Sequence, residues 1–291
     1  MLLLLLSLSR AIIKVINFNG FLLEFNDTFK ELQFDPETHK YVLEGQTLIS
    51  TTTFIDKMTN EFDSYNTSEQ MAKSYNFNNQ DKSPRFGEYY RQRWKCLADQ
   101  AKALGTRVHM YSELYPYFDT PHDTYEQGVL DFFEWFDEHF IMVTQEMKLY
   151  SKQYRKAGTC DMIAISKTTG KLVLFDWKTS AEIFRFYKGK KLPAPFNKVA
   201  CDFNKYSIQL SDYTNMIHMA TDLEVEESYV VWLHDFTAKF KKKESASYKY
   251  ETPIITEQGP YFGVYKCHDF TNELHSVYQT VTITEDNRTV D

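Results

Sequence analysis

The sequence lacks the cysteine patterns that mark disulfide-stapled and metal-ribbon proteins. It has only four cysteines in 291 residues (Cys96, Cys160, Cys201 and Cys267), and no two of them form a C-x-x-C pair. This scatter argues against a disulfide framework, a zinc ribbon and a cysteine-bound iron–sulfur cluster. We therefore expect an intracellular, reducing compartment.

Long hydrophobic runs are also missing. The N-terminal stretch "MLLLLLSLSR" reaches a charge at Arg10, so its apolar run is too short to span a membrane. It has no basic flank or clear cleavage site, which disfavours a signal peptide. We expect either a folded strand that continues through residues 11–18 or an imprecise start of the reading frame. No other segment approaches membrane-spanning length, so we expect no membrane partner.

An excess of positive charge is absent as well. The net charge is −7, which argues against a protein that coats nucleic acid by bulk electrostatics. Local basic clusters do occur, at residues 152–156, 188–191 and 239–243, and each taken alone is typical of a solvated surface. A nucleic-acid enzyme that relies on local charge stays compatible with this composition.

The chain does contain the alternating patterns of an α/β protein. Residues 11–50 alternate apolar and polar positions, with turn signals at Asn19-Gly20 and Glu44-Gly45, which predicts an antiparallel β-meander. Ser50 or a nearby Thr is placed to cap the helix that begins at Phe54. Residues 60–92 are polar and predict a loose helical or loop region.

Helical and strand patterns then follow in an order that predicts mixed strand directions. A Thr169-Gly170 turn separates the second and third strands of the middle region. The predicted elements are a helix at 93–115 interrupted at Gly105, a helix at 124–140, strands at 141–151, 157–166 and 171–180, a helix at 205–221, a strand at 227–236, and a C-terminal hairpin and helix.

Two acids fall at the same end of the predicted hairpin. Asp161 lies eight residues before Thr169 and Asp176 six after Gly170, so the two are nearly opposite each other. Lys178 has the parity of Asp176 and projects to the same side. Carboxylates about 5 Å apart raise each other's pKa, and a hard divalent cation such as Mg²⁺ or Mn²⁺ relieves the repulsion.

These groups suit phosphate chemistry. With a further oxygen ligand from the Trp177 carbonyl, a metal, two acids and a lysine can activate a water and neutralise a pentacovalent phosphate. The alternative is an ordinary surface hairpin with a charged rim.

The stretch "GTCDMIAI…KLVLFDWKTS" resembles the core motif of the PD-(D/E)xK nuclease superfamily, particularly its RecB-like exonuclease branch. The resemblance implies an α/β, restriction-endonuclease-like core with a central mixed β-sheet flanked by helices. It also implies that Asp161 and Asp176 bind the metal and that Lys178 positions the attacking water. Cys160 stands where the family name has proline, but RecB-like members commonly have a Gly-x-x-Asp form instead.

Two outlying motifs add to this resemblance. "GTRVH" is similar to the helix motif whose histidine contributes to the metal site, which implies that His109 is a ligand rather than a structural histidine. "QLSDY" is similar to a Q-x-x-x-Y motif that supports the site and contacts nucleic acid. Gln209 and Tyr213 share one helical face. The alternative places Tyr213 in the core and Gln209 on the helix surface.

Looser candidates complete the predicted site. Glu146 lies where related enzymes place an acid on the first core strand, although a solvent-facing position is equally compatible. Thr179 and Ser180 have hydroxyls that can reach a phosphate or cap a turn. "HKYVLEGQTLISTTTFI" resembles the entry segment of phage and mitochondrial genome-maintenance exonucleases, in which Ser50 and Thr52 would offer hydroxyls or a helix N-terminus to a phosphate.

The resemblance divides the chain by expected role. It implies a β-rich segment packed on the core (1–53), a helical and loop region near the substrate channel (54–104), the nuclease core (105–240) and a C-terminal extension (241–291). Aromatic side chains at 54–104 can stack on bases, although buried packing is the usual role of such residues.

The implied activity is that of a deoxyribonuclease dependent on one or two Mg²⁺ or Mn²⁺ ions, without an iron–sulfur cluster. We expect an exonuclease on DNA ends or single-stranded DNA in replication, recombination or repair. An endonuclease of restriction or junction-resolving type and a non-catalytic nucleic-acid-binding protein are the alternatives. The expected partners are DNA and replication or recombination proteins. The expected location is the cytoplasm, or a host's cytoplasm if a phage encodes the chain, with an organelle also compatible.

Overall fold

A computed structural model describes residues 25–59, 63–117, 120–237 and 247–286. The predicted strand at 11–18, the Asn19-Gly20 turn and the basic cluster at 239–243 lie outside these residues. No helix in the described ranges has the length and apolar character needed to cross a membrane.

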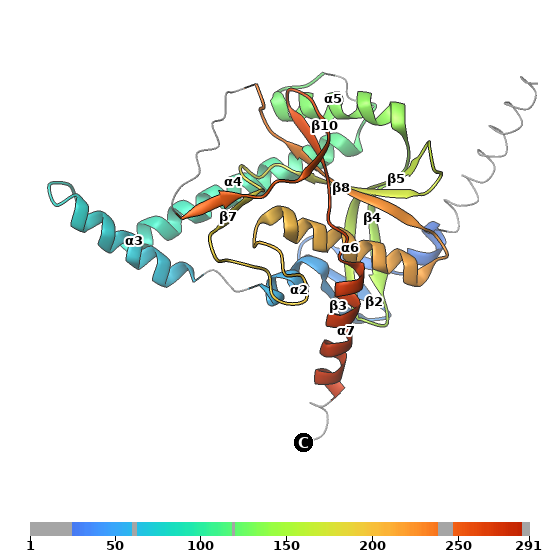
Figure 1. Cartoon of the computed structure of the whole chain (residues 1–291), viewed down its shortest axis with the longest axis horizontal. Helices are drawn as coiled ribbons and strands as arrows, with labels where there is room; N and C mark the ends of the chain where they lie inside the picture. The colour runs from blue at the N-terminus through green and yellow to red at the C-terminus, as the bar shows by residue number, and fades with distance from the viewer. Residues whose placement is uncertain (1–24, 60–62, 118–119, 238–246, 287–291) are drawn as a thin grey trace, which may run out of the picture.

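A nine-stranded mixed sheet forms the centre of the fold (Figure 1). The strand order is β1-β2-β3-β5-β6-β8-β11-β10, and β4 pairs with β5. Because β5 and β6 are antiparallel while β6 and β8 are parallel, the predicted mixed α/β class is confirmed. The strands are β1 (Gln33–Asp35), β2 (Lys40–Leu43), β3 (Gln46–Ser50), β4 (Phe140–Ser151), β5 (Lys156–Ser166), β6 (Leu172–Lys178), β8 (Val225–Leu233), β10 (Ile254–Gln258) and β11 (Phe262–Lys266).

Helices cover both faces of this sheet, and α5 and α6 lie on opposite sides of it (Figure 1). A separate two-stranded ribbon pairs β7 (Arg185–Tyr187) with β9 (Tyr248–Tyr250), which sequence patterns did not predict. The helices are α2 (Thr51–Met58), α3 (Ser64–Asn78), α4 (Gly87–Glu113), α5 (Thr124–His139), α6 (Asp202–Ala220) and α7 (Thr271–Asp286).

The two turns predicted within the described residues are present. Glu44 (φ 52°) and Gly45 (φ 78°) make the two-residue turn between β2 and β3, and Gly170 (φ 77°) lies in the turn between β5 and β6. Left-handed backbone at both central residues is what a tight hairpin requires, and glycine adopts it without a steric penalty. The β-meander is therefore confirmed for β1 to β3.

Two local predictions are wrong. Residues 25–29 are helical rather than extended, because Phe25 and Phe29 lie four residues apart and bury one helical face against the core. The predicted interruption at Gly105 does not occur, since α4 runs unbroken from Gly87 to Glu113. One glycine costs a helix only about 1 kcal/mol, and the helix formers around it outweigh that cost.

The core alternates across β6. Leu172 and Leu174 pack on the side of α6, whereas Val173, Phe175 and Trp177 pack on the side of α5. Because successive side chains on a strand point to opposite faces, Asp176 continues the α6-facing row. The apolar residues of β6 thus anchor the strand that carries Asp176 and Lys178.

Candidate metal and phosphate site

The two predicted acids meet where β5 and β6 separate. Met162 pairs with Phe175, and the same register places Asp161 opposite Asp176, as the turn spacing predicts. Both side chains are buried, with exposed fractions of 7% for Asp161 and 1% for Asp176. The Trp177 backbone N–H donates a 2.8 Å hydrogen bond to Asp161 Oδ2, which fixes the orientation of this carboxylate.

A gap in strand pairing leaves one edge of β5 without a neighbouring strand. Strand β3 pairs with β5 at Lys156 and Ala157, and β6 pairs with it from Met162 onward, so neither covers residues 158–161. Tyr213 from α6 occupies part of this gap. A Cβ on Gly158 would lie 2.4 Å from Tyr213 Cε1, so only glycine permits the ring to approach the strand.

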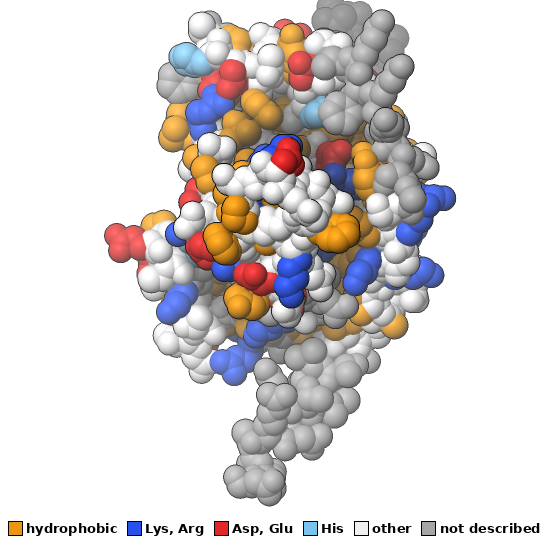
Figure 2. Space-filling model, turned by 90° about the vertical axis from the view of Figure 1, so that its left-hand side faces the viewer, with side chains coloured by type: hydrophobic (Ala, Val, Ile, Leu, Met, Phe, Trp, Pro, Cys, Tyr) orange, Lys and Arg blue, Asp and Glu red, His pale blue; other side chains and the backbone are white. Residues whose placement is uncertain are grey.

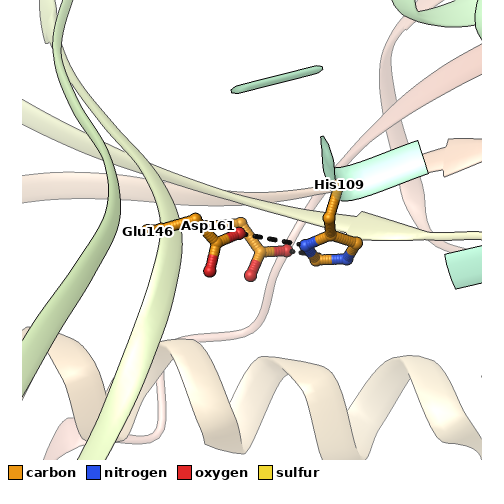
Figure 3. Close-up of side chains that lie close together, drawn as sticks. All are labelled: His109, Glu146 and Asp161. Atoms are coloured by element: carbon orange, nitrogen blue, oxygen red, sulfur yellow. Dashed lines mark hydrogen bonds and ion pairs between the residues drawn. The ribbon is translucent and has the colours of Figure 1, made fainter. Parts of the chain in front are cut away.

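His109, Glu146 and Asp161 converge from three elements (Figure 3). His109 Nδ1 on α4 lies 3.1 Å from Glu146 Oε1 on β4, and His109 Nε2 lies 3.6 Å from Asp161 Oδ2 on β5. One ligand atom from each residue lies within 4.8 Å of the others. Such a set of one imidazole and two carboxylates suits a divalent cation.

An unusual backbone conformation positions Glu146. Its φ is 48°, within a strand where Gln145 pairs with Met162 and Met147 pairs with Cys160. Gln145 Nε2 donates to the Ser112 carbonyl on α4, while Glu146 contacts His109 on the same helix. Adjacent residues of a regular strand point to opposite faces, so the left-handed residue is what directs both toward α4. This conformation costs a non-glycine residue about 1–2 kcal/mol, and such strain is concentrated at functional sites.

The charges of the site shift one another's pKa values. Burial alone would lower the pKa of His109, but the carboxylates of Asp161 and Glu146 outweigh it and raise that pKa to about 9. Burial raises the pKa of Asp161, and it raises the pKa of Asp176 to about 6 with a further contribution from Asp161. The acids thus oppose each other's ionisation, which is the repulsion that a cation would relieve.

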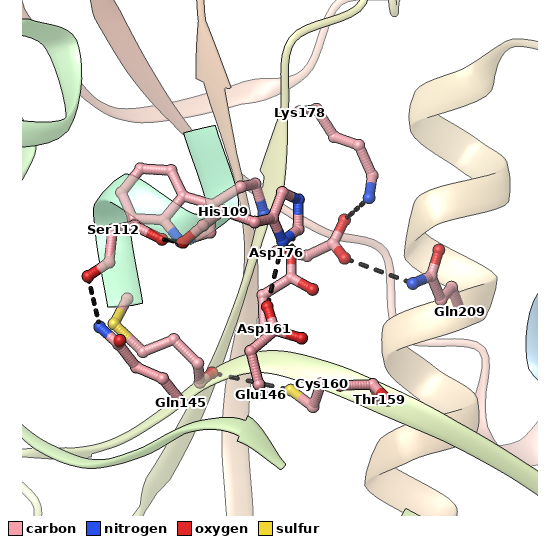
Figure 4. Close-up of polar contacts among 12 residues, drawn as sticks. His109, Ser112, Gln145, Glu146, Thr159, Cys160, Asp161, Asp176, Lys178 and Gln209 are labelled. Atoms are coloured by element: carbon pink, nitrogen blue, oxygen red, sulfur yellow. Dashed lines mark hydrogen bonds and ion pairs between the residues drawn. The ribbon is translucent and has the colours of Figure 1, made fainter. Parts of the chain in front are cut away.

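Lys178 and Gln209 hold Asp176 from two sides (Figure 4). Lys178 Nζ lies 2.5 Å from Asp176 Oδ2, and Gln209 Nε2 donates to Asp176 Oδ1 at 3.3 Å. Gln209 also donates to the Tyr213 hydroxyl at 3.2 Å. Burial would lower the pKa of Lys178, but Asp176 and Asp161 outweigh it and raise that pKa, so the side chain is an ammonium.

Other predicted residues have structural partners within the protein, and their contact with a phosphate stays a prediction. Ser50 caps α2 by accepting from the Thr53 N–H at 3.1 Å, and the Thr52 hydroxyl lies 3.1 Å from that of Ser50. The Ser180 hydroxyl lies 3.3 Å from the Tyr206 hydroxyl, and the Ser180 carbonyl accepts from Trp232 Nε1 at 2.7 Å.

Two further candidates lie beside the acids. A Cβ on Gly105 would be 3.9 Å from Thr179 Oγ1, which places Thr179 beside α4. The Trp177 ring is buried against Phe132 and Phe133 on the α5 side of the sheet, and a metal contact of its carbonyl stays a prediction.

The site also includes two tyrosines that the sequence patterns did not predict. The Tyr41 hydroxyl lies 2.9 Å from Thr159 Oγ1. Burial raises the pKa of Tyr41 most, and the negative charges of Glu146 and Asp161 raise it further. The Lys178 ammonium lies 4.6 Å from the centre of the Tyr206 ring. Tyr41 stands in the entry segment and Tyr206 three residues before Gln209, so helical spacing offered a signal for the latter.

The imidazole and carboxylate donors of this site are of the types that bind divalent cations. Three donors converge, and the buried Asp176 carboxylate lies beside them in an ion pair with Lys178. Comparison with known proteins adds no assignment: no protein-family model matches the chain, and no curated protein sequence matches it significantly.

Proposed function

We propose that the chain is a metal-dependent deoxyribonuclease with a PD-(D/E)xK core, acting as an exonuclease on DNA ends or single strands. One observation carries the proposal. The cluster of His109, Glu146 and Asp161 lies directly beside the buried pair of Asp176 and Lys178, at one end of an anchored hairpin. Cation ligands and a fixed ammonium side by side are what hydrolysis of a phosphodiester requires.

The proposed cation is Mg²⁺ or Mn²⁺, held by His109, Glu146 and Asp161, with Asp176 as the adjoining carboxylate. When bound, the ion would polarise a phosphate oxygen and lower the pKa of a water. The mixed set of nitrogen and oxygen donors suits Mn²⁺ as well as Mg²⁺.

The chain's own residues supply the remaining requirements. Lys178 is an ammonium beside Asp176, so we assign it the role of a hydrogen-bond donor that orients water and balances negative charge, not that of a base. Gln209 fixes the other oxygen of Asp176 and ties it to Tyr213. The Tyr206 ring restricts the position of the Lys178 ammonium by a cation–π contact.

The choice of exonuclease over endonuclease depends on the RecB-like motifs that contain His109 and Gln209. A restriction-type or junction-resolving endonuclease has the same chemistry, and a non-catalytic nucleic-acid-binding protein has the same fold. These alternatives differ in products, so digestion separates them.

The test is digestion of end-labelled single-stranded and double-stranded DNA and of a closed circle, with Mg²⁺, Mn²⁺ or chelator. Exonuclease activity releases short products from ends and spares the circle. Asp161→Asn and Asp176→Asn should each lower the rate by at least about 100-fold, since each removes a charge from the metal site. Asp222→Asn is the matched control, because Asp222 is exposed and lies near the opposite end of β6. Metal-dependent digestion that survives both site variants would refute the assignment.

A further inference from the structure

Helices α3 and α4 form an arm that projects from the body of the molecule (Figure 1). Residues 64–104 carry seven Lys or Arg and four Asp or Glu, while the whole chain has a net charge of −7. Helix α3 packs on α4, and Arg91 of α4 donates to Ser68 of α3 at 2.7 Å and to Glu69 at 3.0 Å. The arm is therefore a positively charged element on an acidic protein.

The tip of the arm is held in a fixed conformation. Asn76 Nδ2 donates to the Arg85 carbonyl, the Arg85 N–H donates to Asn76 Oδ1, and both hydrogen bonds are 2.8 Å long. The Arg85 guanidinium lies 3.8 Å from the centre of the Tyr75 ring and 4.8 Å from that of Tyr89. These contacts join the end of α3 to the start of α4 across the loop between them.

Exposed aromatic rings flank this clamp. Phe77 and Phe86, which directly follow Asn76 and Arg85, are 76% and 72% exposed, and Tyr89 is 43% exposed. Figure 2 views the molecule from the side on which the arm projects, where hydrophobic side chains lie among Lys and Arg. Exposed rings are available to a ligand, and the hydrogen bonds between Asn76 and Arg85 fix the backbone next to Phe77 and Phe86, which lowers the cost of ordering this loop on binding. We call Phe77, Arg85, Phe86 and Tyr89 the tip platform.

We propose that the tip platform binds single-stranded nucleic acid by stacking bases on Phe77, Phe86 and Tyr89. The inference rests on the proposed nuclease function, whose substrate it specifies as a strand with an unpaired segment. Aromatic rings interleaved with positive charge are the usual platform for single strands, since every base has a flat face and every nucleotide carries a phosphate. The charge of the arm favours this polyanion over an apolar protein partner or a second copy of the chain.

The platform lies far from the candidate metal site. Gly87 at the tip and His109 at the site are 22 residues apart on α4, which at about 1.5 Å per residue is roughly 33 Å. That distance corresponds to about ten nucleotides at the ~3.4 Å spacing of a stacked strand. A strand bound at the site therefore reaches the platform only if it is long enough.

The experiment measures binding without cleavage, by fluorescence anisotropy of labelled single-stranded oligonucleotides in chelator. The variant is Phe77→Ala with Phe86→Ala, and the control is Ile254→Ala with Ile255→Ala, two residues of β10 that are 66% and 55% exposed. We expect the platform variant to bind a 20-nucleotide strand at least about tenfold more weakly, the loss of one stacked base or more. A strand of about 5 nucleotides spans only half the distance between the two sites and can occupy only one of them at a time, so its affinity should fall less than that of the 20-nucleotide strand. Phe77→Trp with Phe86→Trp should bind normally.

The outcomes separate this inference from the proposed function. Equal binding of the 20-nucleotide strand by the wild type and the alanine variant overturns the platform, even where the wild type digests DNA. Platform-dependent binding without metal-dependent digestion supports the platform and refutes the nuclease. A smaller sedimenting species for the alanine variant, with nucleic-acid binding unchanged, identifies the tip as a contact between copies and overturns the inference.

Discussion

Binding of a divalent cation should displace a proton from His109. In the metal-free site Asp161 and Glu146 raise the pKa of His109 to about 9, against an ordinary value of 6.5. An imidazole with this pKa is about 99% protonated at pH 7, and a protonated imidazole cannot coordinate a metal. We therefore expect nearly one proton to be released for each Mn²⁺ bound at pH 7.

The same shift fixes the pH dependence of metal affinity. Between about pH 7 and 8.5 each unit of pH should lower the apparent Kd for Mn²⁺ about tenfold, with a plateau above pH 9. Asp176 does not contribute in this window, because its pKa of about 6 lies below it. Since the folded pKa of His109 is raised, its stabilisation of the metal-free protein is complete below pH 6.5 and is lost as pH rises through 9. It amounts to at most about 3 kcal/mol, because the ring is 30% exposed.

Isothermal titration calorimetry in buffers of different ionisation enthalpy counts the released protons. His109→Gln should bind the ion more weakly and release almost no protons at pH 7. His275→Gln, which changes an exposed histidine on α7, should match the wild type. A proton count near zero for the wild type at pH 7, with Mn²⁺ bound, would show that His109 is not a ligand.

Three further predictions concern the supports of the site. Asp212→Ala should destabilise the protein by about 3–5 kcal/mol in urea unfolding, because it leaves the charge of the buried Lys156, whose Nζ lies 2.6 Å from Asp212, without its partner. A loss below about 1 kcal/mol would contradict this expectation. Gly158→Ala should cost about 1–3 kcal/mol and lower activity, because the new Cβ collides with Tyr213. Gly105→Ala should add stability, because its Cβ would meet only an ordinary van der Waals contact with Thr179, and equal effects of the two changes would exclude the packing argument. Glu146→Gln should lower the pKa of His109 by about a unit or more in NMR titration, and an unchanged pKa would remove Glu146 from the site.

The hairpin was predictable because its information is local. The parity of Asp161, Asp176 and Lys178 about a glycine turn sets their positions, and the apolar run of β6 anchors them. The cap at Ser50 and the stripe of α5 follow from equally local rules. The continuity of α4 could not be predicted from Gly105 alone. The helix continues through this residue because the helix propensity of the whole segment outweighs the cost of one glycine.

Glu146 shows why a site can escape pattern reasoning even when its residue is noticed. Alternation along β4 assigns Gln145 and Glu146 to opposite faces, yet both contact α4 because Glu146 has a left-handed backbone. No residue near it signals this conformation, since glycine and asparagine are the usual markers and neither is adjacent. Its position is fixed by the rest of the structure: Gln145 and Met147 on either side of it pair with β5, and α4 places His109 opposite it. The left-handed backbone of Glu146 directs its carboxylate to His109, and that carboxylate helps to raise the pKa of the imidazole. The strained conformation and part of the raised pKa therefore have the same cause, which is the packing of β4 against α4.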